Sequence, residues 1–359
     1  MGARRDGNIR YISSATLIFS FLIALLLPNR ASIQGFSIRA PSTSSNEKSA
    51  LFSGHAQNKA SPTSNSVIMT YLEINGWLLS MGGVTILVDP ILEGSLNFGI
   101  PSLYEGKKRV LPMVGLADCL PEIDCLLITQ GLDDHAHVQT LQKLRRIDPN
   151  LPIVAPPSAM SALAKAGFTN PEIINHSEEV VIRPRATTAR KIAASKTKIT
   201  TASNTKIHIR ATKGALVGPP WQRRENGYVL SGYTTSCTES SRESQLLPSI
   251  YLEPHVEFNR RELAKLGMPV DICISPITGQ SLPAFELVHG PRDTMRLLEI
   301  LKPKYLVPMQ NGDLDTEGPV SGLVSTVGSV DELQDLLEKS RLATQLVDVV
   351  PGKDIEVTM

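Results

Sequence analysis

The sequence predicts an α/β fold in four layers, an αβ/βα sandwich of two mixed β-sheets whose outer faces are covered by helices. Short apolar runs such as Asp124–Thr129 are typical of strands that are buried on both faces. They alternate with segments of helical period such as residues 138–147, as in an α/β sheet. This order of strands followed by helices occurs twice along the chain, so we expect two sheets packed face to face.

The first half of the folded part begins at Val67. Its opening strands are short and are separated by turn glycines, Gly76 and then Gly82 and Gly83. The predicted strands are Val67–Ile74, Trp77–Leu79, Val84–Val88, Asp124–Thr129 and Pro152–Ala155, and the predicted helices are 138–147 and Ala159–Ala166.

The second half has the same alternation of strands and helices. Its last predicted helix, Val330–Ser340, is followed by the strand-like run Ala343–Val350, so we expect the C-terminal residues to pack on the domain. The predicted strands are Lys206–Ala211, Tyr228–Tyr233, Ile250–Glu253 and Asp271–Ser275, and the other predicted helices are Phe258–Leu266 and Thr294–Leu301.

Charge and cysteine content exclude several classes of protein. The formal net charge is +1, so no nucleic-acid partner is expected. Four cysteines in 359 residues, none of them in a Cys-x-x-Cys pair, do not indicate a disulfide scaffold. A basic stretch at about residues 184–205 is interpreted as a solvated insertion, with a basic patch for an anionic substrate as the alternative. A small-molecule substrate or ligand is expected, and the sequence favours no particular oligomeric state.

Residues 1–35 have the composition of a secretory signal peptide. Basic residues come first, followed by the apolar run Ala15–Leu27, which is shorter than a bilayer span and ends at Pro28. Cleavage would leave no stable membrane span. An N-terminal membrane anchor that is not cleaved is the alternative.

Residues 36–66 have the polar, basic and acid-poor composition of a transit peptide, with Glu47 as the single acidic residue. The junction at Phe36 is similar to that of bipartite targeting sequences in algae with complex plastids, where a phenylalanine follows the cleavage site. The resemblance implies import into a plastid through the ER, and a secreted or ER-resident protein is the alternative. The folded domain is then expected at residues 67–359.

Polar side chains follow the buried strand Asp124–Thr129. The carboxyl ends of strands are the usual place for the site of an α/β sheet. Aspartate and histidine are common ligands of zinc, iron and manganese, although side chains so close in sequence cannot all point the same way. The candidates are Asp133, Asp134, His135 and His137.

This segment resembles the motif of the metallo-β-lactamase superfamily, which places His-x-His-x-Asp-His directly after a strand. The corresponding positions of this chain are Gln130, Leu132, Asp134 and His135. Asp89 lies where the family places an aspartate that hydrogen-bonds a metal-binding histidine. The resemblance is strongest to a divergent branch with plastid and cyanobacterial members, and it implies the same four-layer fold.

Two further parts of the resemblance lie in the second half of the chain. Glu253 ends a predicted strand where the family has a metal-bridging aspartate, and His255 is close to it. Gln310 lies where the family has the histidine of its last motif. The resemblance therefore extends over about residues 67–313.

The departures from the motif limit the expected metal content. Leucine has no lone pair, glutamine is a weak zinc ligand, and the window Thr212–Gly218 contains no histidine, so the first metal site of the family should be absent. The resemblance implies that the second site holds at most one divalent ion, Zn²⁺, Mn²⁺ or Fe²⁺, and a site without metal is the alternative. Its expected ligands are Asp134, His135, Glu253 and Gln310, with His255 or His137 as substitutes and with Asp89 and Gln130 as their supporting partners.

These residues support two functional hypotheses and a structural one. In the first, metal-bound water hydrolyses an ester, lactone or phosphodiester, and Asp134 orients this water or accepts its proton. In the second, the domain is catalytically inactive and binds a ligand or a protein. In the third, Asp134 and His135 only satisfy each other's hydrogen bonds. Trp221 and Arg223, in a rigid loop before a strand, are the candidates for contact with a substrate.

Overall fold

The computed structural model describes residues 51–52, 55, 65–185, 204–217, 221–237, 242–267, 270–283 and 285–359. The predicted signal peptide, nearly all of the predicted transit peptide and most of the predicted basic insertion lie outside these residues. The described part contains no helix with the length and apolarity that a bilayer crossing requires.

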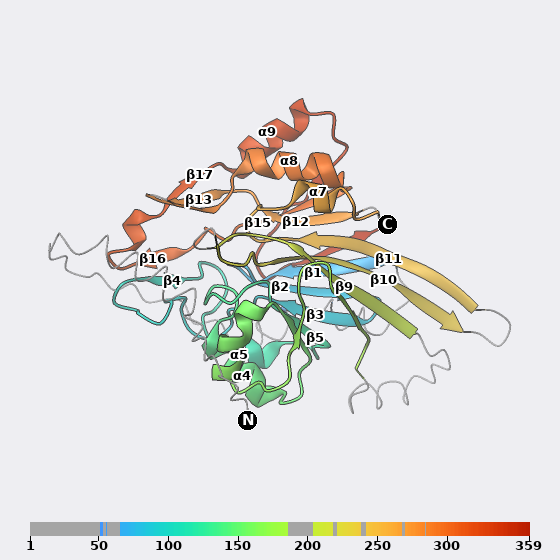
Figure 1. Ribbon diagram of the computed structural model, residues 1–359, viewed down its shortest axis with the longest axis horizontal. Helices are drawn as coiled ribbons and strands as arrows, with labels where there is room; N and C mark the ends of the chain where they lie inside the picture. Colours follow the sequence, from blue (N-terminus) through green and yellow to red (C-terminus); the bar gives the residue numbers. More distant parts are fainter. Residues whose placement is uncertain are drawn as a thin grey trace, which may run out of the picture.

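Two seven-stranded mixed sheets form the centre of the domain (Figure 1). The first sheet has the order β19-β1-β2-β3-β5-β6-β7, with β1 Ser66–Tyr71, β2 Trp77–Met81, β3 Val84–Val88, β5 Cys125–Leu127, β6 Ile153–Ala155, β7 Glu172–Ile173 and β19 Asp354–Thr358. The second has the order β18-β15-β12-β11-β10-β9-β8, with β8 Glu179–Ile182, β9 Asn204–Lys213, β10 Asn226–Cys237, β11 Arg242–Leu252, β12 Ile272–Pro276, β15 Tyr305–Met309 and β18 Gln345–Leu346.

The alternation of side chains along each strand divides the core into layers. In β3, Ile86 and Val88 pack between the two sheets with Ile209 and Leu230, whereas Leu87 points to the outer face and packs against the helices. Ile86, Leu87 and Val88 are therefore fully buried on both faces of the sheet, which explains their apolar character.

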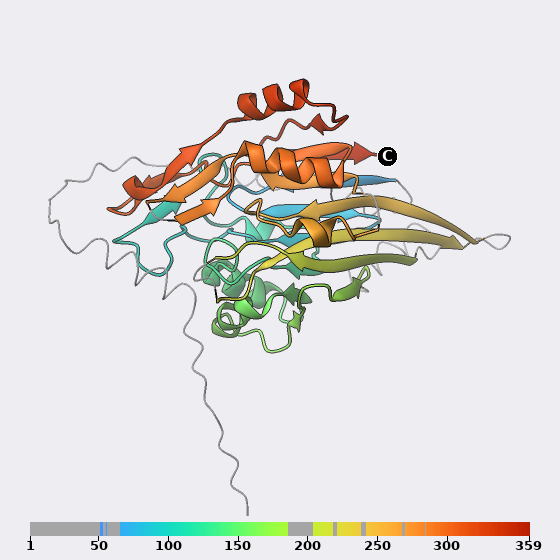
Figure 2. The same cartoon turned by 45° about the horizontal axis from the view of Figure 1, so that its top comes forward.

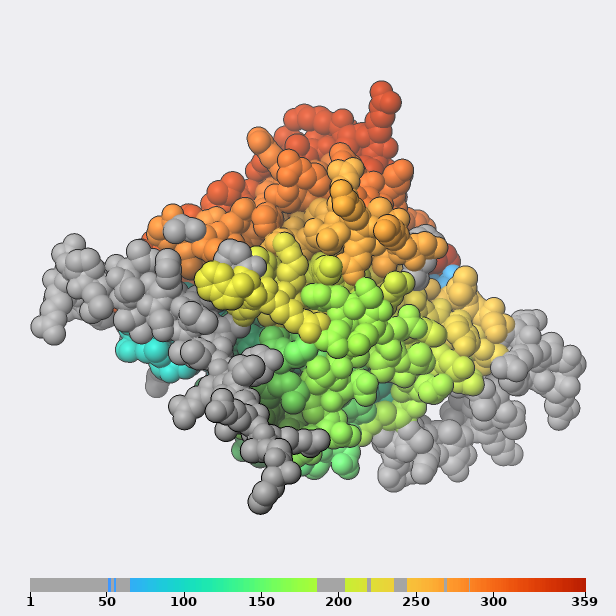
Figure 3. All heavy atoms as spheres, viewed as in Figure 1, coloured from blue at the N-terminus to red at the C-terminus, as the bar shows by residue number. Residues whose placement is uncertain are grey.

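Helices cover the outer faces of both sheets, which confirms the predicted four layers. Figure 1 shows α4 and α5 below the first sheet and α8 and α9 above the second, and the turned view keeps this order of layers (Figure 2). In the space-filling view the green residues of the first helical layer gather on the lower face and the orange residues of the second on the upper (Figure 3). The helices are α4 Val138–Ile147, α5 Met160–Lys165, α7 Arg260–Leu263, α8 Pro291–Leu301 and α9 Val330–Lys339.

Two small sheets at one end of the sandwich are absent from the sequence-based prediction. Their strands are only three or four residues long, which is too short to carry a clear periodic signal. The first pairs β4 Glu105–Lys107 with β16 Asp315–Glu317, and the second has the order β14-β13-β17, with β13 Gly279–Leu282, β14 Phe285–Val288 and β17 Ser325–Val327. Short 3₁₀ helices are η1 Ala117–Cys119, η2 Pro157–Ala159 and η3 Ser321–Leu323.

The first predicted strand, Val67–Ile74, is too long. β1 ends at Tyr71 because the next residues form a tight turn, in which Glu73 and Ile74 have positive φ angles of 66° and 58°. This turn places Asn75 at the end of the sandwich where the candidate site residues lie. At the other end of the chain, β19 pairs with β1, so the C-terminal residues pack on the domain as expected.

Candidate functional site

The loops that carry the candidate residues meet at one end of the sandwich. β3 and β5 run parallel to each other, as do β11, β12 and β15, so within each sheet the carboxyl ends of these strands lie together. The residues directly after them are Asp89 after β3, Gln130–His135 after β5, Glu253–His255 after β11, and Gln310 and Asn311 after β15.

Asp89 contacts the Nδ1 side of the His135 ring. Its Oδ2 lies 2.7 Å from Nδ1 of His135, and its Oδ1 accepts a hydrogen bond of 2.8 Å from the backbone N–H of Thr129. The Thr129 hydroxyl also donates to Asp89 Oδ2. All three side chains are buried, so the ring of His135 is fixed in one orientation.

The second ring nitrogen of His135 also has partners. Its Nε2 lies 3.2 Å from Oδ2 of Asp134 and 3.0 Å from Nδ2 of Asn75. Burial lowers the pKa of His135, but Asp134 and Asp89 outweigh it and raise that pKa to about 10. Burial raises the pKa of Asp134, and the adjacent His135 reverses this shift and lowers it. Asp89, His135 and Asp134 therefore form a row of interacting ionisable groups, with the imidazole between the two carboxyl groups.

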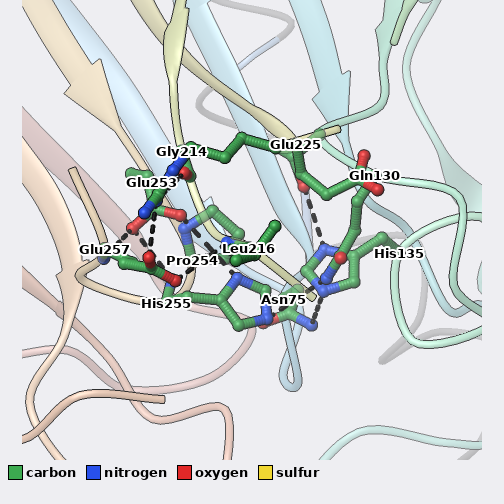
Figure 4. Close-up of polar contacts among 12 residues, drawn as sticks. Asn75, Gln130, His135, Gly214, Leu216, Glu225, Glu253, Pro254, His255 and Glu257 are labelled. Carbon is green, nitrogen blue, oxygen red and sulfur yellow. Dashed lines mark hydrogen bonds and ion pairs between the residues drawn. The ribbon is translucent and has the colours of Figure 1, made fainter. Parts of the chain in front are cut away.

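His255 lies against His135, and Glu253 is turned away from it (Figure 4). The two imidazole rings are stacked with their centroids 5.3 Å apart, and Gln130 Nε2 lies 3.2 Å from Nε2 of His255. Oε2 of Glu253 accepts the backbone N–H groups of His255 at 3.1 Å and of Glu257 at 2.9 Å. Its Oε1 lies 3.7 Å from His255 Nδ1. Glu253 thus stabilises its own loop.

Two asparagines complete the cluster, and the sequence analysis missed both of them. Nδ2 of Asn311 donates to Asn75 Oδ1 at 3.2 Å and to Pro254 O at 3.1 Å, and Oδ1 of Asn311 accepts from Gln280 Nε2 at 3.2 Å. An Asn-Gly pair at a strand end is an ordinary turn signal, so nothing in the local pattern marked Asn311 as a site residue. The side chain that joins the cluster after β15 is Asn311, next to the predicted Gln310.

His137 lies elsewhere, at the start of α4. Its Nδ1 is 3.0 Å from the hydroxyl of Thr140, which also accepts the backbone N–H of Leu92. Burial lowers the pKa of His137, and the neighbouring Asp133 opposes this shift. Asp133 in turn accepts the backbone N–H of Phe98 at 3.1 Å. His137 and Asp133 therefore fasten the loop before α4 in place.

The arrangement does not fit a bound metal ion. Within the described residues, no three His, Cys, Asp or Glu side chains converge in a group that could hold one. Both nitrogens of His135 are occupied, Oδ2 of Asp134 contacts His135, and Oε2 of Glu253 accepts two backbone N–H groups. Asp134, His135 and Glu253 therefore do not converge on one point, because Glu253 is turned to the backbone N–H groups of its own loop.

A pocket of about 240 Å³ opens beside this cluster. Its polar end is formed by Asn75, Asp134, His255, Gln280 and Asn311. Most of the other lining residues are apolar or aromatic, and the small sheets supply several of them. They are Ile74, Leu96, Phe98, Tyr104, Leu132, Val217, Leu282, Leu287, Val288, Leu314, Val320 and Val324, with Gly312, Thr316, Ser321 and Thr326.

The predicted substrate contacts Trp221 and Arg223 lie outside this pocket. The side chain of Trp221 is 84% exposed, and neither residue lines the pocket. In the same loop Arg224 bonds Glu257, with Arg224 Nη1 2.5 Å from Glu257 Oε1. The expectation for Trp221 and Arg223 is therefore not met at this pocket, because the loop directs Arg224 inward to Glu257.

Glu225 is a buried acid that the sequence analysis did not single out. Its Oε2 accepts a hydrogen bond of 2.5 Å from the hydroxyl of Ser158, and Figure 4 shows its side chain beside Gln130. Burial raises the pKa of Glu225 to about 7, more than Ser158 and His135 lower it. Oε1 of Gln130 is buried and has no hydrogen-bond partner among the described residues. Glu225 thus lies next to Gln130, the residue at the first histidine position of the family motif.

Several solved structures of enzymes are similar to the chain. The chain is 15% identical to isothiocyanate hydrolase from Delia radicum gut bacteria, covering 81% of this chain and 100% of that chain with a TM-score of 0.50. For Igni18, a metallo hydrolase from Ignicoccus hospitalis KIN4/I, the identity is 14%, the coverage 82% and 99%, and the TM-score 0.46. For CmlA, a diiron β-hydroxylase from Streptomyces venezuelae, the identity is 16% and the TM-score is 0.48, and the match covers 82% of this chain and 54% of that chain. No curated protein matches the chain.

The assignment of the chain to a family rests on the match to a family model. The model of the β-lactamase superfamily domain matches residues 68–310, which is more than half of the chain and includes every strand from β2 to β15. With the two mixed sheets and their outer helices, the chain belongs to the β-lactamase superfamily domain family.

Proposed function

We propose that this chain is a metal-independent binding member of the family, which holds a small and largely apolar ligand in the pocket beside Asp134. One observation carries the proposal. The side chains at the expected ligand positions hydrogen-bond each other, backbone groups and the amides of Asn75 and Gln130. Two buried oxygens of this network, Oδ1 of Asp134 and Oε1 of Gln130, lack a hydrogen-bond partner in the described part of the chain, but amide groups are poor replacements for imidazole at a zinc site.

The pocket is suited to a small molecule. Its volume of about 240 Å³ is below the roughly 300–1,000 Å³ of sites for drug-sized ligands. Apolar walls supply the affinity for such a ligand, and a few polar groups at one end, among them His255 and Asn311, orient it.

Hydrolysis with a single metal is the second candidate, because the chain is metallo-hydrolase-like in its fold. A metal at this site would need Nε2 of His135 and Oδ2 of Asp134, which now contact each other. Binding would therefore require His135 to separate from Asp134 and Asn75. The metal would supply an activated water for attack on an ester, lactone or phosphodiester.

Metal content separates the two candidates. The protein is purified without chelators from medium supplied with zinc, manganese and iron, and its metals are measured by mass spectrometry. We expect well under one equivalent of each metal and no change in melting temperature on addition of Zn²⁺ or Mn²⁺. One retained equivalent that raises the melting temperature, and that is lost in the His135→Gln variant, would favour the hydrolase.

A further inference from the structure

The pocket beside Asp134 has an acidic residue at its polar end, next to the imidazole of His255. Among the described residues that line it, Asp134 is the one carboxylate, and there is no lysine or arginine. Oδ1 of Asp134 is buried without a hydrogen-bond partner in the described part of the chain. The Asp134 side chain as a whole is 22% exposed and lines the pocket, so a cationic group there can pair with its carboxylate.

The charges behind Asp134 do not cancel its own. Asp89 and Asp134 are two carboxylates on either side of one imidazole, that of His135. If the imidazole carries a proton, the three groups sum to −1, and if it is neutral they sum to −2. The sign is the same in both states, so this end of the pocket attracts cations and repels anions.

An aromatic pair faces the same space. The rings of Phe98 and Tyr104 have their centroids 5.7 Å apart, and both residues line the pocket with Asp134. Tyr104 is close enough to Asp134 for its pKa to rise to about 12, through burial first and the negative charge of Asp134 second. Aromatic faces next to a carboxylate are a common surrounding for ammonium groups.

From this charge, the aromatic pair and the apolar walls, we infer that the pocket selects a primary ammonium ligand with a short apolar tail. The ammonium pairs with the carboxylate of Asp134 and lies near Phe98 and Tyr104, and the tail lies along Leu132, Val217 and the small sheets. This inference rests on the proposed metal-independent binding function and gives its ligand a chemical class.

Three probes of equal chain length test the inference: hexylamine, 1-hexanol and sodium hexanoate. Their binding to the full-length protein is followed at neutral pH by changes in protein NMR spectra. Hexylamine is cationic at this pH, 1-hexanol neutral and hexanoate anionic. We expect hexylamine to bind about tenfold more tightly than 1-hexanol, as a charge-assisted hydrogen bond and a cation–π contact predict, and hexanoate to bind most weakly.

Substitutions assign the selectivity to named residues. Asp134→Asn keeps the shape and removes the charge, so hexylamine should lose its advantage while 1-hexanol still binds. Asp118→Asn makes the same change at an exposed acid outside the pocket, and we expect it to preserve the advantage. If Asp134→Asn does not fold, Phe98→Leu replaces it, and it should reduce the advantage of hexylamine by removing one aromatic face.

Equal binding of hexylamine and 1-hexanol, tighter binding of hexanoate, or an unchanged preference in Asp134→Asn would overturn the ammonium inference and leave the binding function intact. A Val324→Phe variant, which fills the pocket from its rim, shows whether the probes bind there. If no probe binds, or if all bind this variant as tightly as the original protein, the proposed pocket function is wrong as well.

Discussion

Asp89 Oδ2 lies 2.7 Å from His135 Nδ1, and both side chains are buried at the end of the sandwich. In a metal centre such a contact orients a ligand. Here the opposite nitrogen of the ring faces Asp134 and Asn75, so the same contact closes a network within the protein. Asp89 therefore fixes the orientation of His135 at the position where the family resemblance expects the support of a metal-binding histidine.

The Asp89→Asn variant tests this role. The substitution removes the negative charge of Asp89 beside His135. It also places an amide NH₂ group, which is a donor, next to Thr129 and His135, which already donate to this position. We expect a loss of about 2–4 kcal/mol in the free energy of unfolding, measured with urea. The exposed Asp118→Asn serves as a control, since its ion pair with Lys143 is worth at most about 1 kcal/mol. Equal losses in the two variants would contradict the role.

Glu225 predicts a substitution that stabilises the protein. Burial raises its pKa to about 7, so the folded state favours the neutral form. The stability associated with this neutral form is fully present below the unfolded pKa, about 4.3, and is lost as the pH rises through about 7. Glu225→Gln removes this loss, and at pH 8 we expect it to raise the free energy of unfolding by about 2 kcal/mol.

Glu257→Gln is the matched control for this measurement. Glu257 pairs with Arg224 and accepts the backbone N–H of Leu216 at 2.8 Å, so its replacement should destabilise the protein at the same pH. Urea unfolding at pH 5 and pH 8 gives both comparisons. If Glu225→Gln is destabilising at both pH values, the acid is held in its charged form and the prediction is wrong.

The sequence predicts the layers of this fold better than its site. Apolar runs such as β5 identify buried strands because burial on both faces leaves no room for polar side chains. The relation of Asp89 to His135 depends on two adjacent parallel strands, and the resemblance to the family predicts an aspartate beside a histidine at this position. Asn75 and Asn311 come from distant turns, and no local pattern shows that their amides meet.

Asn311 and Gln310 are adjacent residues with different expected roles. Asn311→Ala removes the donor to Asn75 and Pro254, and we expect a loss of about 1–3 kcal/mol in the free energy of unfolding. Gln310 is only partly buried, so Gln310→Ala should cost about 0.5 kcal/mol or less. The two variants are compared by urea unfolding, and a larger loss for Gln310→Ala would show that Gln310 is the residue on which this strand end depends.

We propose plastid import for the intact chain, on the composition of residues 1–66 and the junction at Phe36. The prediction is that a fluorescent reporter fused to residues 1–66 accumulates in the plastid of an alga with complex plastids. Replacement of Phe36 by alanine should leave entry into the ER unchanged and block the later step, because the basic start and the apolar run that direct ER entry stay intact. Retention of the unaltered fusion in the ER would contradict the proposal, and so would equal import of the Phe36→Ala fusion, since the aromatic residue at the junction would then carry no signal.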